Sequence, residues 1–135
     1  MIRYAQIGKN LVCVSHQYDH LSSDQLIDLF DYDMVYDVNS LNHASLIDMI
    51  LDAAAAGVSM WRIEQLMSGY QIPDHEILVR ASQNGIKVYR QGDIFTAVVG
   101  YKGRTVYGYG KKELYSVIGL LQALNNNESS RTFNP

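Results

Sequence analysis

Two histidines and one cysteine in the first twenty residues are of types that can do chemistry. His16 and His20 lie four residues apart, a spacing that brings two imidazoles to one metal ion only on a helix. The segment that holds them, with Asp19 between, is expected to be a loop after a strand, so we expect no metal site. Cys13 stands between two valines in an alternating run, which favours a buried apolar residue over a nucleophile.

A second group of candidate residues is the acidic run of Asp31, Asp33 and Asp37. Such spacing is typical of calcium loops, but the run lacks the glycine and the closing bidentate glutamate that those loops need. Together with Asp19, the run instead predicts an acidic surface for protein binding. An inhibitor or adaptor of the phage or mobile-element type would use it to dock on the basic surface of a nucleic-acid-handling protein.

Motifs of catalysis are missing from the sequence. It has no nucleophile elbow, no phosphate-binding loop and no convincing Ser/His/Asp set. The glycines between residues 100 and 110 are spaced for strands and turns, not for the start of a phosphate-binding helix. We therefore expect a non-enzymatic binding protein that carries no cofactor.

Charge is distributed unevenly along the chain, whose formal net charge is −3. Residues 1–56 have two basic and eight acidic side chains, whereas residues 57–135 have nine basic and six acidic ones. This asymmetry indicates an anionic partner for the basic half, and it also allows two copies to pair head to tail as a homodimer.

Tyrosines that alternate with basic residues make the C-terminal part a candidate nucleic-acid-binding unit, because aromatic rings can stack on bases while cations meet phosphates. The candidate residues are Lys87, Tyr89, Arg90, Lys102, Arg104, Tyr107, Tyr109, Lys111 and Lys112.

The run from Phe95 to Leu114 reads FTAVVGYKGRTVYGYGKKEL, and LLQAL follows at 120–124. Within residues 72–125 this pattern resembles the second half of a double-stranded-RNA-binding domain, a family built as a helix, three strands and a helix. It is also similar to the arm-type DNA-binding domain of phage integrases.

This resemblance implies an αβββα unit that contacts nucleic acid. Lys111 and Lys112 match the lysines with which the RNA-binding family contacts phosphates at the start of its last helix. The next lysine of that pattern is absent, because Tyr115 or Ser116 stands in its place. The resemblance is therefore stronger evidence for the fold than for the function.

The elements before this unit follow from local signals. Residues 2–14 alternate in polarity around Gly8, as in a β-hairpin. The segment Ser22–Gln25 has the hydroxyl and the glutamine that start a helix. A short strand is expected over Met34–Val38, and apolar residues at helical spacing predict a strong helix over 41–56.

Two more helices are expected in the middle of the chain, one capped by Ser59 and one opened by Pro73. The alanines before Gly57 fit the spacing of a helix-turn-helix motif with the helix that follows. That second helix would expose Met60 and Trp61 together with several polar side chains, of which only Arg62 is basic. We therefore favour a plain helical hairpin.

The hydrophobic period then changes from 3.6 to 2, which predicts strands over Ile86–Arg90, Ile94–Tyr101 and Thr105–Tyr109. Tight turns are expected at Gln91-Gly92 and Lys102-Gly103. The first turn would place Val88 opposite Phe95. One face of this three-stranded sheet is then apolar and covered by the last helix, and the other carries tyrosines and threonines.

The expected fold class is α+β: an N-terminal hairpin with helices, a helical hairpin in the middle, and a C-terminal three-stranded antiparallel sheet with a packed helix. The expected regions are 1–70, 71–125 and a disordered, dispensable tail at 126–135, all within one compact domain. No apolar run is long enough for a transmembrane helix, and no secretion signal opens the chain, so we expect a cytoplasmic protein without a membrane partner.

Overall fold

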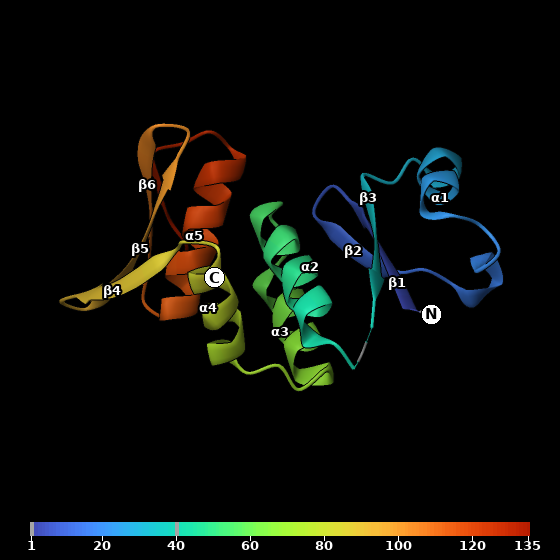
Figure 1. Ribbon diagram of the computed structural model, residues 1–135, viewed down its shortest axis with the longest axis horizontal. Helices are drawn as coiled ribbons and strands as arrows, with labels where there is room; N and C mark the ends of the chain where they lie inside the picture. Colours follow the sequence, from blue (N-terminus) through green and yellow to red (C-terminus); the bar gives the residue numbers. More distant parts are fainter. Residues whose placement is uncertain (1, 40) are drawn as a thin grey trace.

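The computed structural model describes residues 2–39 and 41–135 and has the expected α+β architecture. Figure 1 shows a sheet at each end of the molecule, with helices between them. The first elements are β1 (Ile2–Ile7), β2 (Asn10–Cys13), the short 3-10 turn His16–Tyr18, α1 (Ser23–Phe30) and β3 (Met34–Val38). The central helices are α2 (His43–Ala55), α3 (Met60–Gly69) and α4 (Asp74–Gln83). The last elements are β4 (Lys87–Gln91), β5 (Ile94–Tyr101), β6 (Arg104–Gly110), α5 (Glu113–Asn125) and β7 (Ser130–Thr132).

Strand β1 is the middle strand of the N-terminal sheet and pairs antiparallel with β2 and β3. One face of this sheet packs on α1 through a small cluster of Ala5, Val14, Leu26 and Val35. The opposite face contributes Tyr4, Leu11 and Val38 to the main core. The sheet is therefore enclosed between α1 and the central helices.

Cys13 is exposed, so the expectation that it is buried is wrong. It is the last residue of β2, which lies at the edge of the sheet. Alternation along a strand predicts which residues share a face, but it does not say how far the covering helices reach along that face.

Side-chain caps begin the helices where the sequence predicts them. Ser22 and Gln25 form a reciprocal capping box at α1, in which each side chain accepts a hydrogen bond from the backbone N–H of the other residue. Ser59 caps α3 by accepting from the N–H of Arg62, and Pro73 precedes α4. No helix within residues 2–39 and 41–135 is long and apolar enough to cross a membrane.

The C-terminal sheet has the order β4-β5-β6-β7, with α5 packed on one face. The turn at Lys102-Gly103 is confirmed, because Tyr101 pairs with Arg104. Both turn residues have positive φ, as a type I′ hairpin requires.

The β4–β5 turn lies one residue later than expected, at Gly92-Asp93. Gly92 has a φ of +60°, which suits a turn with glycine at its first central position. Val88 therefore pairs with Ala97 and not with Phe95. The register shift is two residues, so every side chain keeps its predicted face.

The predicted disordered tail at 126–135 is wrong, because β7 adds a fourth strand to the sheet. It pairs parallel with β6, and the N–H of Phe133 donates to the carbonyl of Tyr109 at 2.8 Å. The Phe133 ring also meets that of Tyr115 edge-on, with centroids 5.5 Å apart. The tail satisfies backbone groups of β6 that would otherwise lie at an open sheet edge.

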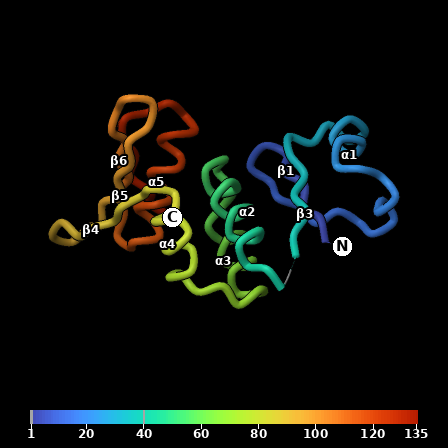
Figure 2. Tube along the Cα trace, viewed as in Figure 1, coloured from blue at the N-terminus to red at the C-terminus, as the bar shows by residue number. Residues whose placement is uncertain are grey.

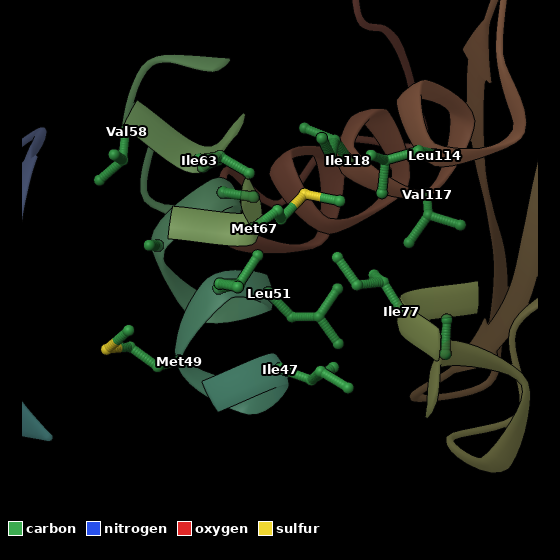
Figure 3. Close-up of a cluster of buried hydrophobic side chains, with 14 of the residues drawn as sticks. Ile47, Met49, Leu51, Val58, Ile63, Met67, Ile77, Leu114, Val117 and Ile118 are labelled. Carbon is green, nitrogen blue, oxygen red and sulfur yellow. The ribbon is translucent and has the colours of Figure 1, made fainter. Parts of the chain in front are cut away.

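The main core lies among the central helices and α5. Figure 3 shows Leu51, Met67, Ile77 and Ile118 converging from α2, α3, α4 and α5. The same cluster continues into the N-terminal sheet at one end and the C-terminal sheet at the other. Residues of both expected regions, 1–70 and 71–125, therefore pack together in one core.

Glycines in β6 bring this strand against α5. A Cβ on Gly108 would overlap backbone atoms of Ser116 and Leu120, whereas a Cβ on Gly100, in β5, meets nothing within 4 Å. We expect Gly108→Ala to lower the free energy of unfolding by about 3 kcal/mol, because the helix backbone must move away. Gly100→Ala, the matched control, should stay within about 0.5 kcal/mol of the wild type. Urea unfolding measures both, and equal midpoints for the two variants would refute the close contact.

The role of β7 in stability can be tested by ending the chain after Glu128. We expect this truncation to lower the melting temperature by roughly 5–10 °C, because β6 loses its ladder partner and Tyr115 loses the Phe133 ring. Removing only Asn134 and Pro135 leaves β7 intact and should change the melting temperature little. Calorimetry that finds all three chains equally stable would restore the original expectation of a dispensable tail.

Candidate nucleic-acid interface

The C-terminal sheet has one covered face and one open face. Helix α5 packs against β4, β5 and β6 on the covered face, and on its other side it contacts α2 and α4. In Figure 1 the sheet forms one end of the molecule, with α5 between it and α2. The register puts one set of alternate residues on the open face: Lys87, Tyr89, Ile94, Thr96, Val98, Thr105, Tyr107 and Tyr109.

Tyrosine rings dominate this open face. Tyr107 and Tyr109 lie parallel to within 4°, with ring centroids 6.4 Å apart. Tyr89 is 43% exposed, and it lies across Thr96 from Tyr109. Thr96, between these two tyrosines, is only 1% exposed although it is on the open face, and its hydroxyl donates to Oε1 of Gln91 at 3.0 Å. The face therefore carries three tyrosines on neighbouring strands, two of which have parallel rings.

Of the four predicted lysines, Lys87 and Lys111 lie on or beside this surface, whereas the ammonium groups of Lys102 and Lys112 lie over rings of the other side of the sheet. Lys87 projects from the open face in β4, next to Val98 of β5, which lies between it and Tyr107 of β6. Lys102 is in the β5–β6 turn, with its ammonium 5.1 Å from the centre of the Tyr101 ring. Lys111 follows β6 directly.

Lys112 is the N-cap residue of α5 and makes no side-chain cap hydrogen bond. Its ammonium lies 5.3 Å from the centre of the Tyr115 ring. All four lysines are exposed.

Two predicted arginines belong to the other face, so the nine predicted residues do not form a single surface. Arg104 donates hydrogen bonds to the carbonyl of Glu128 at 3.2 Å and to Oδ1 of Asn127 at 2.9 Å. Arg90 donates to the carbonyl of Gly92 at 2.8 Å. Both are used to hold turns in place. Because side chains alternate along a strand, Arg90 lies on the face opposite to Tyr89, and Arg104 on the face opposite to Tyr107. This alternation, visible in the sequence, could have removed both arginines from the set of candidate binding residues.

A hollow at one end of the open face was missed by the sequence analysis. It measures about 420 Å³, and we call it the Tyr109 hollow. It is lined by Ile94, Tyr109, Gly110, Lys111, Thr132 and Asn134. Two of these residues lie in the segment expected to be disordered, and no local pattern in that segment indicates that it pairs with β6.

The C-terminal sheet unit is basic, whereas the rest of the chain is acidic. Residues 86–135 contain seven basic and three acidic side chains, and residues 1–85 contain four and eleven. The excess of positive charge thus belongs to the unit that carries the open face, although only Lys87 lies on that face, with Lys111 at its end.

The predicted acidic residues lie in the N-terminal lobe, which consists of β1, β2, α1 and β3, away from this face (Figure 2). Asp33 accepts a hydrogen bond from the N–H of Gly8 at 2.7 Å and so holds the β1–β2 turn. Asp31 ends α1 in the left-handed conformation, and Asp19 contacts His16 at 3.3 Å. Asp37 is exposed in β3 opposite Arg3. Two of these aspartates, Asp19 and Asp33, thus make local contacts in the fold, and the four come from separate elements.

Helices α2 and α3 do not present a basic recognition surface. Met60, which a recognition helix would expose, is buried in the core. Trp61 is 72% exposed, but Arg62 turns back to donate to the carbonyl of Leu11 at 3.1 Å. Helix α4 begins with acidic side chains in its first turn. This charge pattern agrees with a plain helical hairpin.

A cleft of about 490 Å³ between α2 and the C-terminal sheet contains two carboxylates, Asp48 and Asp52. Asp48 forms a bidentate pair with Arg80, at 2.8 and 2.9 Å. Partial burial and the charge of Asp48 raise the pKa of Asp52. Burial and the nearby Asp52 raise the pKa of Tyr36 to about 12. Across the described parts of the chain, no group of three or more His, Cys, Asp or Glu side chains is arranged to hold a metal ion.

Comparison with known proteins gives no further lead, since the chain matches no family model, no curated protein and no solved structure. The geometry and charge of the open face are therefore the features that bear on function.

The different positions of Arg104 and Lys102 lead to a test of stability. We expect Arg104→Ala to lower the free energy of unfolding by about 1–2 kcal/mol, because two hydrogen bonds to the segment before β7 are lost. Lys102→Ala, two residues away in the exposed turn, should change it by less than about 0.5 kcal/mol. Denaturant titration of both variants checks this, and a larger loss for Lys102→Ala would contradict the structural role of Arg104.

Proposed function

We propose that this chain is a non-enzymatic binding protein that holds an unpaired nucleic-acid strand on the open face of its C-terminal sheet. The observation that carries the proposal is the parallel pair of Tyr107 and Tyr109 on the open sheet face, with Lys87 on this face and Lys111 at its end. Single-stranded nucleic acid is held in this manner, by aromatic platforms for the bases and cations for the backbone.

The energy of such binding has two sources. Each base that stacks on a ring contributes about 1–3 kcal/mol, whatever its sequence. Lysines contribute through the release of counterions from the phosphates they neutralise. Lys87 and Lys111 lie on or beside the tyrosine face, so a backbone that crosses the face passes both.

An unpaired strand suits this face better than the duplex suggested by the resemblance to double-stranded-RNA-binding domains. Bases in a duplex are stacked on one another and cannot meet the rings. A duplex reader also needs cations at several separate points, but Asp93 is in the β4–β5 turn, and Asp74 and Glu76 are in the first turn of α4. These carboxylates would repel the phosphates of a rigid double helix.

The proposal predicts salt-dependent binding of a fluorescent oligothymidylate of roughly 12 nucleotides, a length suited to one binding face. Measured by anisotropy between about 50 and 200 mM salt, the affinity should fall steeply. Lys87→Gln should flatten the slope of log affinity against log salt by about 0.7 for the one lost contact. Tyr107→Ala should weaken binding about tenfold or more while leaving the slope unchanged, because the ring carries no charge.

Matched controls come from parts of the chain outside the C-terminal sheet unit. Trp61→Ala removes an aromatic ring that is 72% exposed on α3, and Lys9→Gln removes a lysine of the β1–β2 turn. Neither should change affinity or slope by more than the experimental error. A hairpin duplex of equal charge should bind more weakly than the single strand.

Absence of binding to any strand at low salt would sink the proposal. The protein-binding alternative would then follow, with the acidic lobe of Asp19, Asp31, Asp33 and Asp37 as its surface.

A further inference from the structure

The Tyr109 hollow is a recess at one end of the open face, bounded by residues of three strands and the segments that follow them. Strand β5 begins and β6 ends at this point, and Phe95 pairs with Gly110. Ile94 and Tyr109 therefore project from the open face on neighbouring strands, and Thr132 adds a third wall because it pairs with Tyr109 from β7. The volume of about 420 Å³ lies within the range of pockets that hold small ligands.

The lining combines three kinds of chemistry in one place. Ile94 and the Tyr109 ring form an apolar wall suited to a flat aromatic group. Thr132 and Asn134 bring a hydroxyl and an amide, and neither side chain hydrogen-bonds to another of the described residues. Lys111 adds a positive charge. A flat ring with a hydrogen-bonding edge and an attached negative charge is the description of a nucleotide.

We propose that the Tyr109 hollow takes one unpaired nucleobase, with adenine preferred, from the strand that crosses the open face. This inference depends on the proposed function. The Asn134 amide presents a donor and an acceptor side by side, the arrangement that pairs with the amino group and ring nitrogen of adenine. The base stacks on Tyr109, and its phosphate lies toward Lys111.

The hollow gives the protein a preferred register on the strand. The stacking face alone accepts any base, because every base has a π-face. One base held by Asn134 and Thr132 sets the position of the neighbouring bases, of which the next can lie on Tyr107.

The test compares two labelled strands by anisotropy: an oligothymidylate of roughly 12 nucleotides and the same strand with one central adenine. The strand with adenine should bind about fivefold to tenfold more tightly, as expected for one bidentate base contact at an open site. Asn134→Ala should remove this difference and leave the affinity for oligothymidylate within about twofold. Asn125→Ala changes an exposed amide at the end of α5, outside the hollow, and should leave the difference intact.

The outcomes separate this inference from the function it depends on. If the wild type binds both strands equally, or if Asn134→Ala keeps the preference, the hollow is not a base site although the open face still binds. If neither strand binds, both proposals fail. The melting curve of Asn134→Ala serves as a control. If it matches that of the wild type, β7 is still in place, and a lost preference for adenine comes from the missing amide.

Discussion

The close contact between the backbones of β6 and α5 is the constraint on which the C-terminal part of the molecule depends. Gly108 and Gly110 remove the side chains that would hold the helix away, and Gly119 does the same for the segment around Arg131. Helix α5 therefore packs on two surfaces, the sheet on one side and α2 on the other. A hydrogen bond from Gln122 to the carbonyl of Ala54, at 3.1 Å, joins α5 to the end of α2.

Local signals were enough to predict most of the elements. The Ser22 capping box, the Lys102-Gly103 turn and the alternation in β5 each involve neighbours within a few residues, so the sequence displays them directly. Strand β7 could not be predicted in this way. It has three residues, no apolar period, and a parallel partner more than twenty residues earlier.

The candidate site shows the same division. Alternation correctly groups Tyr89, Tyr107 and Tyr109 on one face, because the side-chain period of a strand survives a register shift of two. Grouping by charge failed for Arg90 and Arg104, since a cation in a strand can point to either face. The Tyr109 hollow could not be predicted at all, because it exists only where β7 meets β6.

The separation of charge along the molecule bears on how the open face works. Acidic residues are concentrated in the N-terminal lobe and basic ones around the C-terminal sheet, with the central helices and α5 between them (Figure 1). A helix with its side chains is about 10 Å across, and the Debye length at physiological salt is about 8 Å. The negative lobe thus lies more than one Debye length from the tyrosine face, a distance at which solvent ions weaken its effect on a ligand proposed to bind there.

Strand β4 lies at the free edge of the C-terminal sheet, where unpaired backbone groups can add a strand from another chain. Its five residues, KVYRQ, include the charged side chains of Lys87 and Arg90. Charge on a short edge strand is a common defence against aggregation, because a second strand would have to bury it. Lys87, which we propose to contact phosphates, therefore also protects the edge of the sheet from pairing with another chain. The proposed contact with phosphates and the protection of the edge thus place two separate demands on one side chain, and a substitution that keeps the positive charge satisfies both.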